Sequence, residues 1–359
     1  MLYYNTIIIY MLNFLKKTLL SFIIILFSYL SSSKAEIQVV TSIKPLHSLA
    51  SMIMQGVGEP KLIVDGNTSP HNFSLKPSHA KILQTADIVF WIGEDIETFL
   101  EKSLSSLSKK AKVIELMQIS QIKKLKFREK NIFEVSHDDH GHKKHDDHGH
   151  KKHDDHGHKK HDDHGHKKHD DHGHKKHDDH GHKKHDDHGH AHGEFDPHIW
   201  LDPMNAKIIL KEMTKELILL DKKNASKYKA NLRNAHIKID KLVMDINFKI
   251  NKSAKYIVFH DAYQYFENRF GLKTLGALTV NTDILPGAEQ LKNIRNLIKK
   301  EKAKCIFSEP QFNPKIIKAI AKDTNIKTGV FDPLGADLKN NEDLYLKLII
   351  NLSNSLKNC

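Results

Sequence analysis

The chain has 359 residues, a formal net charge of +12, 28 histidines and only two cysteines. A basic balance can indicate nucleic-acid binding, but proteins of that class gather their charge into arginine-rich patches or along one face. Here the lysines are scattered over predicted helices, without clusters of arginine and aromatic residues. We therefore expect no nucleic-acid partner.

The first 35 residues have the order of a targeting segment. Lys16 and Lys17 precede an almost wholly apolar run at 19–30, and the small-residue pattern 33–35 follows it. This order predicts a secretory signal peptide over residues 1–35, cleaved near Ala35. The apolar run is shorter than the ~20 residues that a membrane-spanning helix needs. We therefore expect an exported, soluble mature protein that begins near Glu36.

Strands and helices alternate along both halves of the remaining chain. In the first half, apolar runs predict strands at 37–43, 62–64, 88–92 and 113–116, with helices at 46–54, 77–85 and 96–107. The second half repeats the alternation, with strands at 256–259, 274–280, 305–307 and 328–331 and helices at 262–269, 288–300, 314–323 and 342–356. Such alternation is typical of a parallel sheet with helices on its faces. The sequence therefore predicts an α/β fold of two such lobes, over 36–204 and 253–359.

A helical connector is predicted over 205–252, between the two lobes. Apolar residues from Tyr228 to Ile250 recur every three or four positions, which makes one stripe at helical period. No Gly or Pro occurs from Asn205 to Ile250, so one or two long helices must span this interval. A long helix that joins the lobes would be a stiff connector, and we expect domain closure to be small.

An eight-residue repeat, His-Asp-Asp-His-Gly-His-Lys-Lys, begins at His137 and dominates the middle of the chain. The stretch has no apolar residue to bury, so we predict a disordered, His-rich insertion over about 128–193 within the first lobe. Its histidines are candidate weak metal sites, among them His137, His140, His142, His185, His188, His190 and His192. Weak capture of metal near the main site and a passive repeat expansion are both open interpretations.

Six histidines lie outside the repeat, and three of them share a setting. The six are His47, His71, His79, His198, His236 and His260. His71 follows the strand at 62–64, His260 follows the strand at 256–259, and His198 precedes the connector. In open α/β sheets, ligands bind beyond the carboxyl ends of the strands. We therefore expect these three to meet a ligand, and we assign structural roles to the other three.

Three histidines with a water or a carboxylate make a tetrahedral zinc site. Asp332, which ends the last predicted strand, is the candidate carboxylate. A metal-bound histidine usually passes its other N–H to a carboxylate or a carbonyl, and Asp202 and Asp261 are the acids predicted for that role. Taken by themselves, these positions fit a metal site and a structural role about equally well.

Five segments resemble, in the same order, the motifs of the cluster A-I substrate-binding proteins of metal ABC importers. They are 69–78, 86–93, 196–203, 259–263 and 331–335. The resemblance covers nearly all of residues 36–359. It implies two lobes bridged by one rigid helix, with a metal ion in the cleft on His71, His198 and His260. It also implies a monomer that captures its metal in the periplasm and delivers it to a membrane permease.

Position 260 distinguishes the metals that members of this family carry. Manganese members typically have Glu at the third ligand position, whereas this chain has His260, as zinc members do. Imidazole suits Zn²⁺, while Mn²⁺ favours oxygen ligands. Some zinc members have Glu immediately before the first histidine, but Pro70 stands there in this chain. The resemblance therefore implies Zn²⁺ as the bound metal, with either Asp332 or water as the fourth ligand.

The two cysteines, Cys305 and Cys359, lie in the exported part of the chain. An oxidising compartment favours a disulfide, although two unpaired thiols are the alternative. The resemblance favours the bridge, because a cysteine pair of this kind and a His-rich loop are both features of zinc members. The bridge would tie the last residue to a core strand and pin the C-terminal helix.

Three alternative functions stay open at this point. One is a manganese or iron importer subunit with the same fold, against which His260 argues. Another is a His-rich extracytoplasmic zinc buffer that has no transporter. The last is a zinc hydrolase, which needs a general base beside its metal-bound water; Glu309 is the best spare carboxylate. The chain has neither a His-Glu-x-x-His helix nor a Gly-x-Ser-x-Gly elbow, so we predict no enzyme.

Overall fold

The computed structural model describes residues 14–19, 36–128, 130–133, 193–280, 282, 286–357 and 359. The chain divides into one unit of Met1–Glu134 with Gly193–Cys359 and a second unit of Val135–His192. The predicted cleavage site and the histidines of the repeat lie outside the described residues. Within the described part of the chain, no helix is long and apolar enough to cross a membrane.

The first sheet has four parallel strands in the order β2-β1-β3-β4. These are β1 (Val39–Ile43), β2 (Lys61–Val64), β3 (Ile88–Trp91) and β4 (Lys112–Glu115). The two central strands, β1 and β3, are runs of mostly branched and aromatic residues, and every residue in them is buried. Such runs are typical of strands that are covered on both faces.

The second sheet repeats the same topology, with four parallel strands in the order β6-β5-β7-β8. These are β5 (Tyr256–His260), β6 (Gly276–Thr279), β7 (Cys305–Ser308) and β8 (Lys327–Val330). In both sheets the first strand in the chain is central, and the second strand lies at an edge. The predicted α/β fold with two mainly parallel sheets is confirmed.

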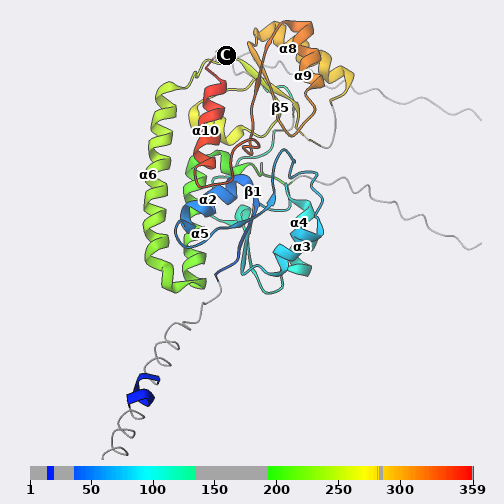
Figure 1. Ribbon diagram of the computed structural model, residues 1–359. Helices are drawn as coiled ribbons and strands as arrows, with labels where there is room; N and C mark the ends of the chain where they lie inside the picture. Colours follow the sequence, from blue (N-terminus) through cyan, green and yellow to red (C-terminus); the bar gives the residue numbers. More distant parts are fainter. Residues whose placement is uncertain are drawn as a thin grey trace, which may run out of the picture. The chain divides into compact units, whose positions relative to one another are not determined.

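Helices flank both sheets (Figure 1). Helices α2 (Lys44–Met54), α3 (Pro77–Gln84) and α4 (Thr98–Leu107) connect the strands of the first sheet, and α7 (Gln264–Phe270), α8 (Ala288–Glu301) and α9 (Lys315–Thr324) connect those of the second. Helix α2 packs against β1 and β2, while α8 and α9 pack against β6, β7 and β8. The strand ends between these helices are therefore left to carry loops and ligand-binding side chains.

Two helices fill the predicted connector: α5 (Pro203–Leu220) and α6 (Ala225–Lys249) (Figure 1). Asp202 caps α5 by accepting a hydrogen bond from the backbone N–H of Met204. Most of the predicted stripe on α6 is buried, and α6 packs against α5 and α2. Only α6, which is 25 residues long, leads into the second sheet.

The C-terminal helix α10 (Leu344–Ser355) returns to the first half of the molecule. It packs against α2 and α6, and Tyr345 donates its hydroxyl proton to the carbonyl of Trp200. Past the helix, Cys359 forms the predicted disulfide with Cys305 on β7. The end of the chain therefore contacts both the helices beside the first sheet and the second sheet itself. The predicted boundaries placed residues 253–359 in the second lobe alone.

The segment before the insertion also crosses to the second sheet. Phe133 donates its backbone N–H to the carbonyl of Leu275, and Ala277 donates to the carbonyl of Asn131. Residues 131–133 thus lie antiparallel along the free edge of β6, with Ile132 paired to Gly276. A Cβ at Gly276 would lie 2.6 Å from the carbonyl oxygen of Asn131, so the close approach requires glycine.

Candidate metal centre

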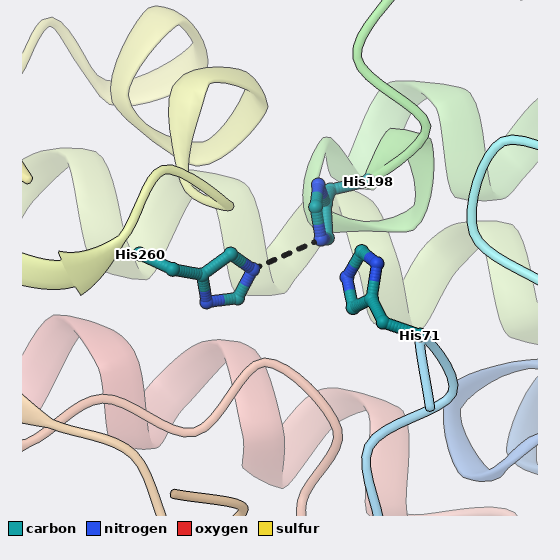
Figure 2. Close-up of side chains that lie close together, drawn as sticks. All are labelled: His71, His198 and His260. Carbon is teal, nitrogen blue, oxygen red and sulfur yellow. Dashed lines mark hydrogen bonds between the residues drawn. The ribbon is translucent and has the colours of Figure 1, made fainter. Parts of the chain in front are cut away.

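Three histidines converge where the two halves of the molecule meet (Figure 2). Each of His71, His198 and His260 offers a ring nitrogen, and these nitrogens lie within 4.8 Å of one another. The ring centroids are 5.2 to 5.7 Å apart. Distances of this size place one ion within reach of all three rings after small side-chain rotations.

Each histidine comes from a different local structure. His260 is the last residue of β5 and is buried. His198 immediately precedes a short 3₁₀ helix, Ile199–Leu201, and is buried as well. His71 lies in the loop after β2, where its backbone N–H donates to the hydroxyl oxygen of Ser69. The structure therefore brings together all three histidines that the sequence analysis selected.

A buried carboxylate holds each of the two buried imidazoles. Asp196 Oδ1 lies 2.7 Å from His198 Nδ1, and both oxygens of Glu309 lie within 2.8 Å of His260 Nδ1. An ionised carboxylate can only accept hydrogen bonds, so Nδ1 of each ring is assigned as the N–H donor and Nε2 as the atom that faces the site. This is the arrangement that metal-binding histidines usually have.

The two Nε2 atoms of these rings face each other at a distance of 3.3 Å (Figure 2). If both Nδ1 protons are used toward carboxylates, two lone pairs meet at this distance unless a proton or another cation lies between them. Positive charge at this point relieves the repulsion. The donor set is made of nitrogen atoms, which suits a borderline metal ion better than a hard one.

Burial and charge act on these groups in opposite directions. Burial, together with the charge of His260, holds the pKa of His198 well below its usual value. Burial also lowers the pKa of His260, but the adjacent Glu309 carboxylate, together with Asp261 and Asp196, raises it above its usual value. Burial raises the pKa of Asp196 to about 7. A cation among these groups would favour their metal-binding protonation states.

A cavity of about 10 Å³ lies beside the three histidines. Its walls are Ser69, Pro70, His71, Ile96, His198, Trp200, His260, Glu309, Gln311, Phe312, Pro333 and Leu334. This volume is close to that of a single water-sized sphere, so the space suits one ion or one water. The indole N–H of Trp200 donates to the carbonyl of Pro333, which fixes one wall in place.

Asp332, the candidate fourth ligand, does not belong to the three-histidine group. Its Oδ1 accepts hydrogen bonds from the backbone N–H groups of Leu334 and Gly335, and from the side-chain amide of Gln311, all at 3.0 Å. Its Oδ2 accepts from the backbone N–H of Ala336 at 2.5 Å. The carboxylate thus organises its own loop, and ligation by Asp332 stays a prediction.

The two acids predicted to orient the histidines have other partners. Asp202 forms two hydrogen bonds with the guanidinium of Arg269 and caps α5. Asp261 accepts a hydrogen bond from Arg128. The hydrogen bonds to the two buried imidazoles come instead from Asp196 and Glu309, so Asp202 and Asp261 do not have the predicted partners. The spacing Asp-x-His at 196–198 was a signal for Asp196.

Comparison with known proteins places this geometry in a family. A family model described as "Zinc-uptake complex component A periplasmic" matches residues 39–359. The chain belongs to this family. The match spans both sheets, the two helices between them and all three histidines.

Curated relatives of this family are similar over most of their length. The high-affinity zinc uptake system protein ZnuA of Brucella abortus is 49% identical over 323 residues, which are 89% of this chain and 91% of the relative. The protein of the same name from Haemophilus influenzae is 41% identical over 90% of this chain and 93% of its own. The one from Yersinia pestis is 34% identical over 90% and 92%.

Solved structures share the fold at lower sequence identity. A crystal structure of ZnuA has a TM-score of 0.64 at 22% identity, and it covers 89% of this chain and 99% of its own. The laminin-binding adhesin Lmb of Streptococcus agalactiae, described as having adhesin and metal-transporting activity, has a TM-score of 0.64 at 21% identity over 90% and 99%. These likenesses support the two-sheet architecture.

Proposed function

We propose that this protein captures Zn²⁺ with high affinity in the periplasm and delivers it to an ABC-type zinc importer. The observation that carries the proposal is the pair of carboxylate-backed imidazoles, whose Nε2 atoms converge with His71 beside a cavity of one ion's size. Membership of the zinc-uptake family and the names of the curated relatives support it.

The donor set favours Zn²⁺ over Mn²⁺. Three imidazoles suit zinc, whereas manganese prefers carboxylate and carbonyl oxygen. In our proposal His71, His198 and His260 supply three ligands, and Asp332 or a water molecule supplies the fourth. The Asp332 carboxylate already accepts hydrogen bonds from the 334–336 backbone, whereas a water molecule has no such bonds to keep.

A binding role fits the site better than catalysis does. Glu309, the spare carboxylate that a zinc hydrolase could use as a base, directs both oxygens at His260 Nδ1. A general base must instead reach the metal-bound water. We therefore propose that the protein is not an enzyme and that Glu309 orients a metal ligand.

Delivery requires the ligands to separate, because His71 and His198 come from the first half of the molecule and His260 from the second. We propose that the permease of a zinc ABC importer drives this separation, and that the protein acts as an exported monomer with a signal peptide cleaved near Ala35. The repeat histidines would capture Zn²⁺ weakly and raise its concentration near the site.

A competitive chelator titration of the mature protein tests the central claim. It uses the variant that lacks His137–His192, first with Zn²⁺ and then with Mn²⁺. We expect one tight Zn²⁺ per chain, much weaker Mn²⁺ binding, and a loss of more than about a hundredfold in zinc affinity on His71→Ala, beyond the range for residues that only support a ligand.

His236→Ala is the matched control, because His236 binds the carbonyl of Lys207 outside the site. Its zinc affinity should equal that of the parent protein. If the shortened protein has no tight zinc site, the proposal is wrong and the chain is chiefly a His-rich metal buffer.

A further inference from the structure

Helix α7 contacts the loop that carries His198 through three side chains. Gln264 donates a hydrogen bond to the carboxylate of Asp196, and Tyr265 donates one to its backbone carbonyl. Arg269 pairs with Asp202, just beyond the same loop. Helix α7 begins four residues after His260. One short segment therefore carries the His260 imidazole and also contacts the loop that carries His198.

The contact between Gln264 and Asp196 is the one closest to the site. Asp196 Oδ1 accepts from the backbone N–H of His198 at 2.9 Å and lies 2.7 Å from its Nδ1. Asp196 Oδ2 accepts from Gln264 Nε2 at 3.1 Å. Asp196 is fully buried and Gln264 is 8% exposed. The Asp196 carboxylate is therefore held by His198 through one oxygen and by the side-chain amide of Gln264, from the other half of the molecule, through the other oxygen.

We propose that Gln264 is a positioning residue for zinc capture, which orients His198 through Asp196. Its amide fixes the plane of the carboxylate, and that plane fixes the direction of His198 Nε2 toward the metal. This role rests on the proposed function, because it presumes that His198 binds the zinc ion. Gln264 itself is not among the residues that line the cavity.

The position of Gln264 makes ligand orientation depend on contact between the two halves. Movement of α7 and His260 away from the His198 loop breaks the bond from Gln264 to Asp196. The carboxylate then loses one of its restraints as the metal loses one of its ligands. Zinc binding and closure consequently stabilise each other through this contact, since any coupling of two equilibria is reciprocal.

Gln264→Met tests the proposal, because methionine keeps the length and unbranched shape of the side chain but has no N–H donor. Gln290→Met is the matched control, since Gln290 donates its amide to the carbonyl of Leu278 in the same half, outside the site. We expect about a tenfold loss of zinc affinity for Gln264→Met, the lower end of the range for groups that support a ligand. The control should keep the parent affinity.

A double-mutant cycle with Asp196→Ala separates positioning from a general structural effect. Without the carboxylate, Gln264 has nothing to orient, so Gln264→Met should change zinc affinity less than about twofold in that background. The absorption bands of bound Co²⁺ should shift in Gln264→Met and stay unchanged in Gln290→Met, because they report ligand geometry.

Two results would overturn the inference: a folded Gln264→Met protein with the parent zinc affinity and Co²⁺ spectrum, or a tenfold loss that persists in the Asp196→Ala background. Circular dichroism checks that each variant is folded. If the parent protein binds no zinc tightly, the proposed function fails first. If His71→Ala abolishes tight binding and Gln264→Met has no effect, only the inference fails.

Discussion

The His198 side and the His260 side of the site reach the same arrangement by different routes. On each side a buried carboxylate holds Nδ1 and leaves Nε2 facing the other imidazole. Asp196 is only two residues from its histidine, so a local turn makes the pair. Glu309 is 49 residues from His260 and reaches it because β7 pairs with β5. The first pair depends on loop geometry and the second on the sheet.

The difference extends to charge. The pKa of His198 is held well below its usual value by burial and by the charge of His260. Burial lowers the pKa of His260, but the combined effect of Glu309, Asp261 and Asp196 raises it above its usual value. Glu309 acts on its partner with both oxygens, whereas Asp196 shares its carboxylate with Gln264. His260 is therefore the imidazole that its carboxylate holds more fully.

The largest effect should come from removing the charge of each carboxylate in turn. We expect Glu309→Gln to lower zinc affinity about a hundredfold and Asp196→Asn about tenfold, the two ends of the range for such partners. The reason is that Glu309 gives both oxygens to one imidazole. Chelator titration of the protein lacking His137–His192 measures both values. Equal losses would mean that the two sides support their histidines equally.

Glu97 provides a reference, because it is as deeply buried as Asp196 but binds the backbone N–H of Ile92 instead of an imidazole. Burial raises its pKa from 4.5 to about 7. The folded state thus keeps the proton that the unfolded state releases, so Glu97 lowers stability progressively as pH rises from 4.5 toward 7. Above pH 7 this loss is complete.

Glu97→Gln removes that titration. Relative to this variant, the parent protein should lose about 2 kcal/mol of unfolding free energy between pH 5.5 and pH 7, at about 1.4 kcal/mol per pH unit. Urea unfolding of the zinc-free proteins at several pH values measures the difference. A difference that does not change with pH would show that Glu97 is ionised throughout in the folded protein.

The smallest expected effect is on the unfolding free energy, and it comes from the two arginines that bond to buried carboxylates near His260 and His198. Arg128 bonds to the buried carboxylates of Asp261 and Glu267, and Arg269 bonds to that of Asp202 alone. The arginine side chains are 28% and 29% exposed, so they form a matched pair. We expect Arg128→Gln to lower the unfolding free energy by about 2 kcal/mol and Arg269→Gln by about 1 kcal/mol.

Urea unfolding without metal measures these two values. The expected difference of about 1 kcal/mol follows from the second carboxylate that Arg128→Gln leaves without its cation. If Arg269→Gln lowers the unfolding free energy more than Arg128→Gln does, the single ion pair of Arg269 contributes more to stability than the two ion pairs of Arg128.

The fold was predictable because the central strands of its sheets are short, buried and largely apolar runs, and the strands alternate with helices. Strands β1, β3 and β5 have no exposed residue, and such runs stand out in a sequence. The path of α10 was not predictable in the same way. Its apolar face shows that it must pack, but periodicity does not say that α2 and α6 are its partners.

For the site, the three histidines were predictable, but their carboxylate partners were not. His71, His198 and His260 were found from their places at strand ends and loops, which chain order gives. Glu309 was noticed only as a spare acid, because its role depends on which strand lies beside β5. Asp261 was preferred for being adjacent to His260, yet successive residues at a strand end point in different directions.

The pairing of residues 131–133 with β6 has a practical consequence. It covers the free edge of β6, and an uncovered sheet edge is a template for pairing with other chains. A truncation that removes the repeat but begins before Lys130 would expose that edge and favour aggregation. A deletion that begins at His137 keeps this pairing, so we expect the variant used for the metal titration to retain a covered sheet edge.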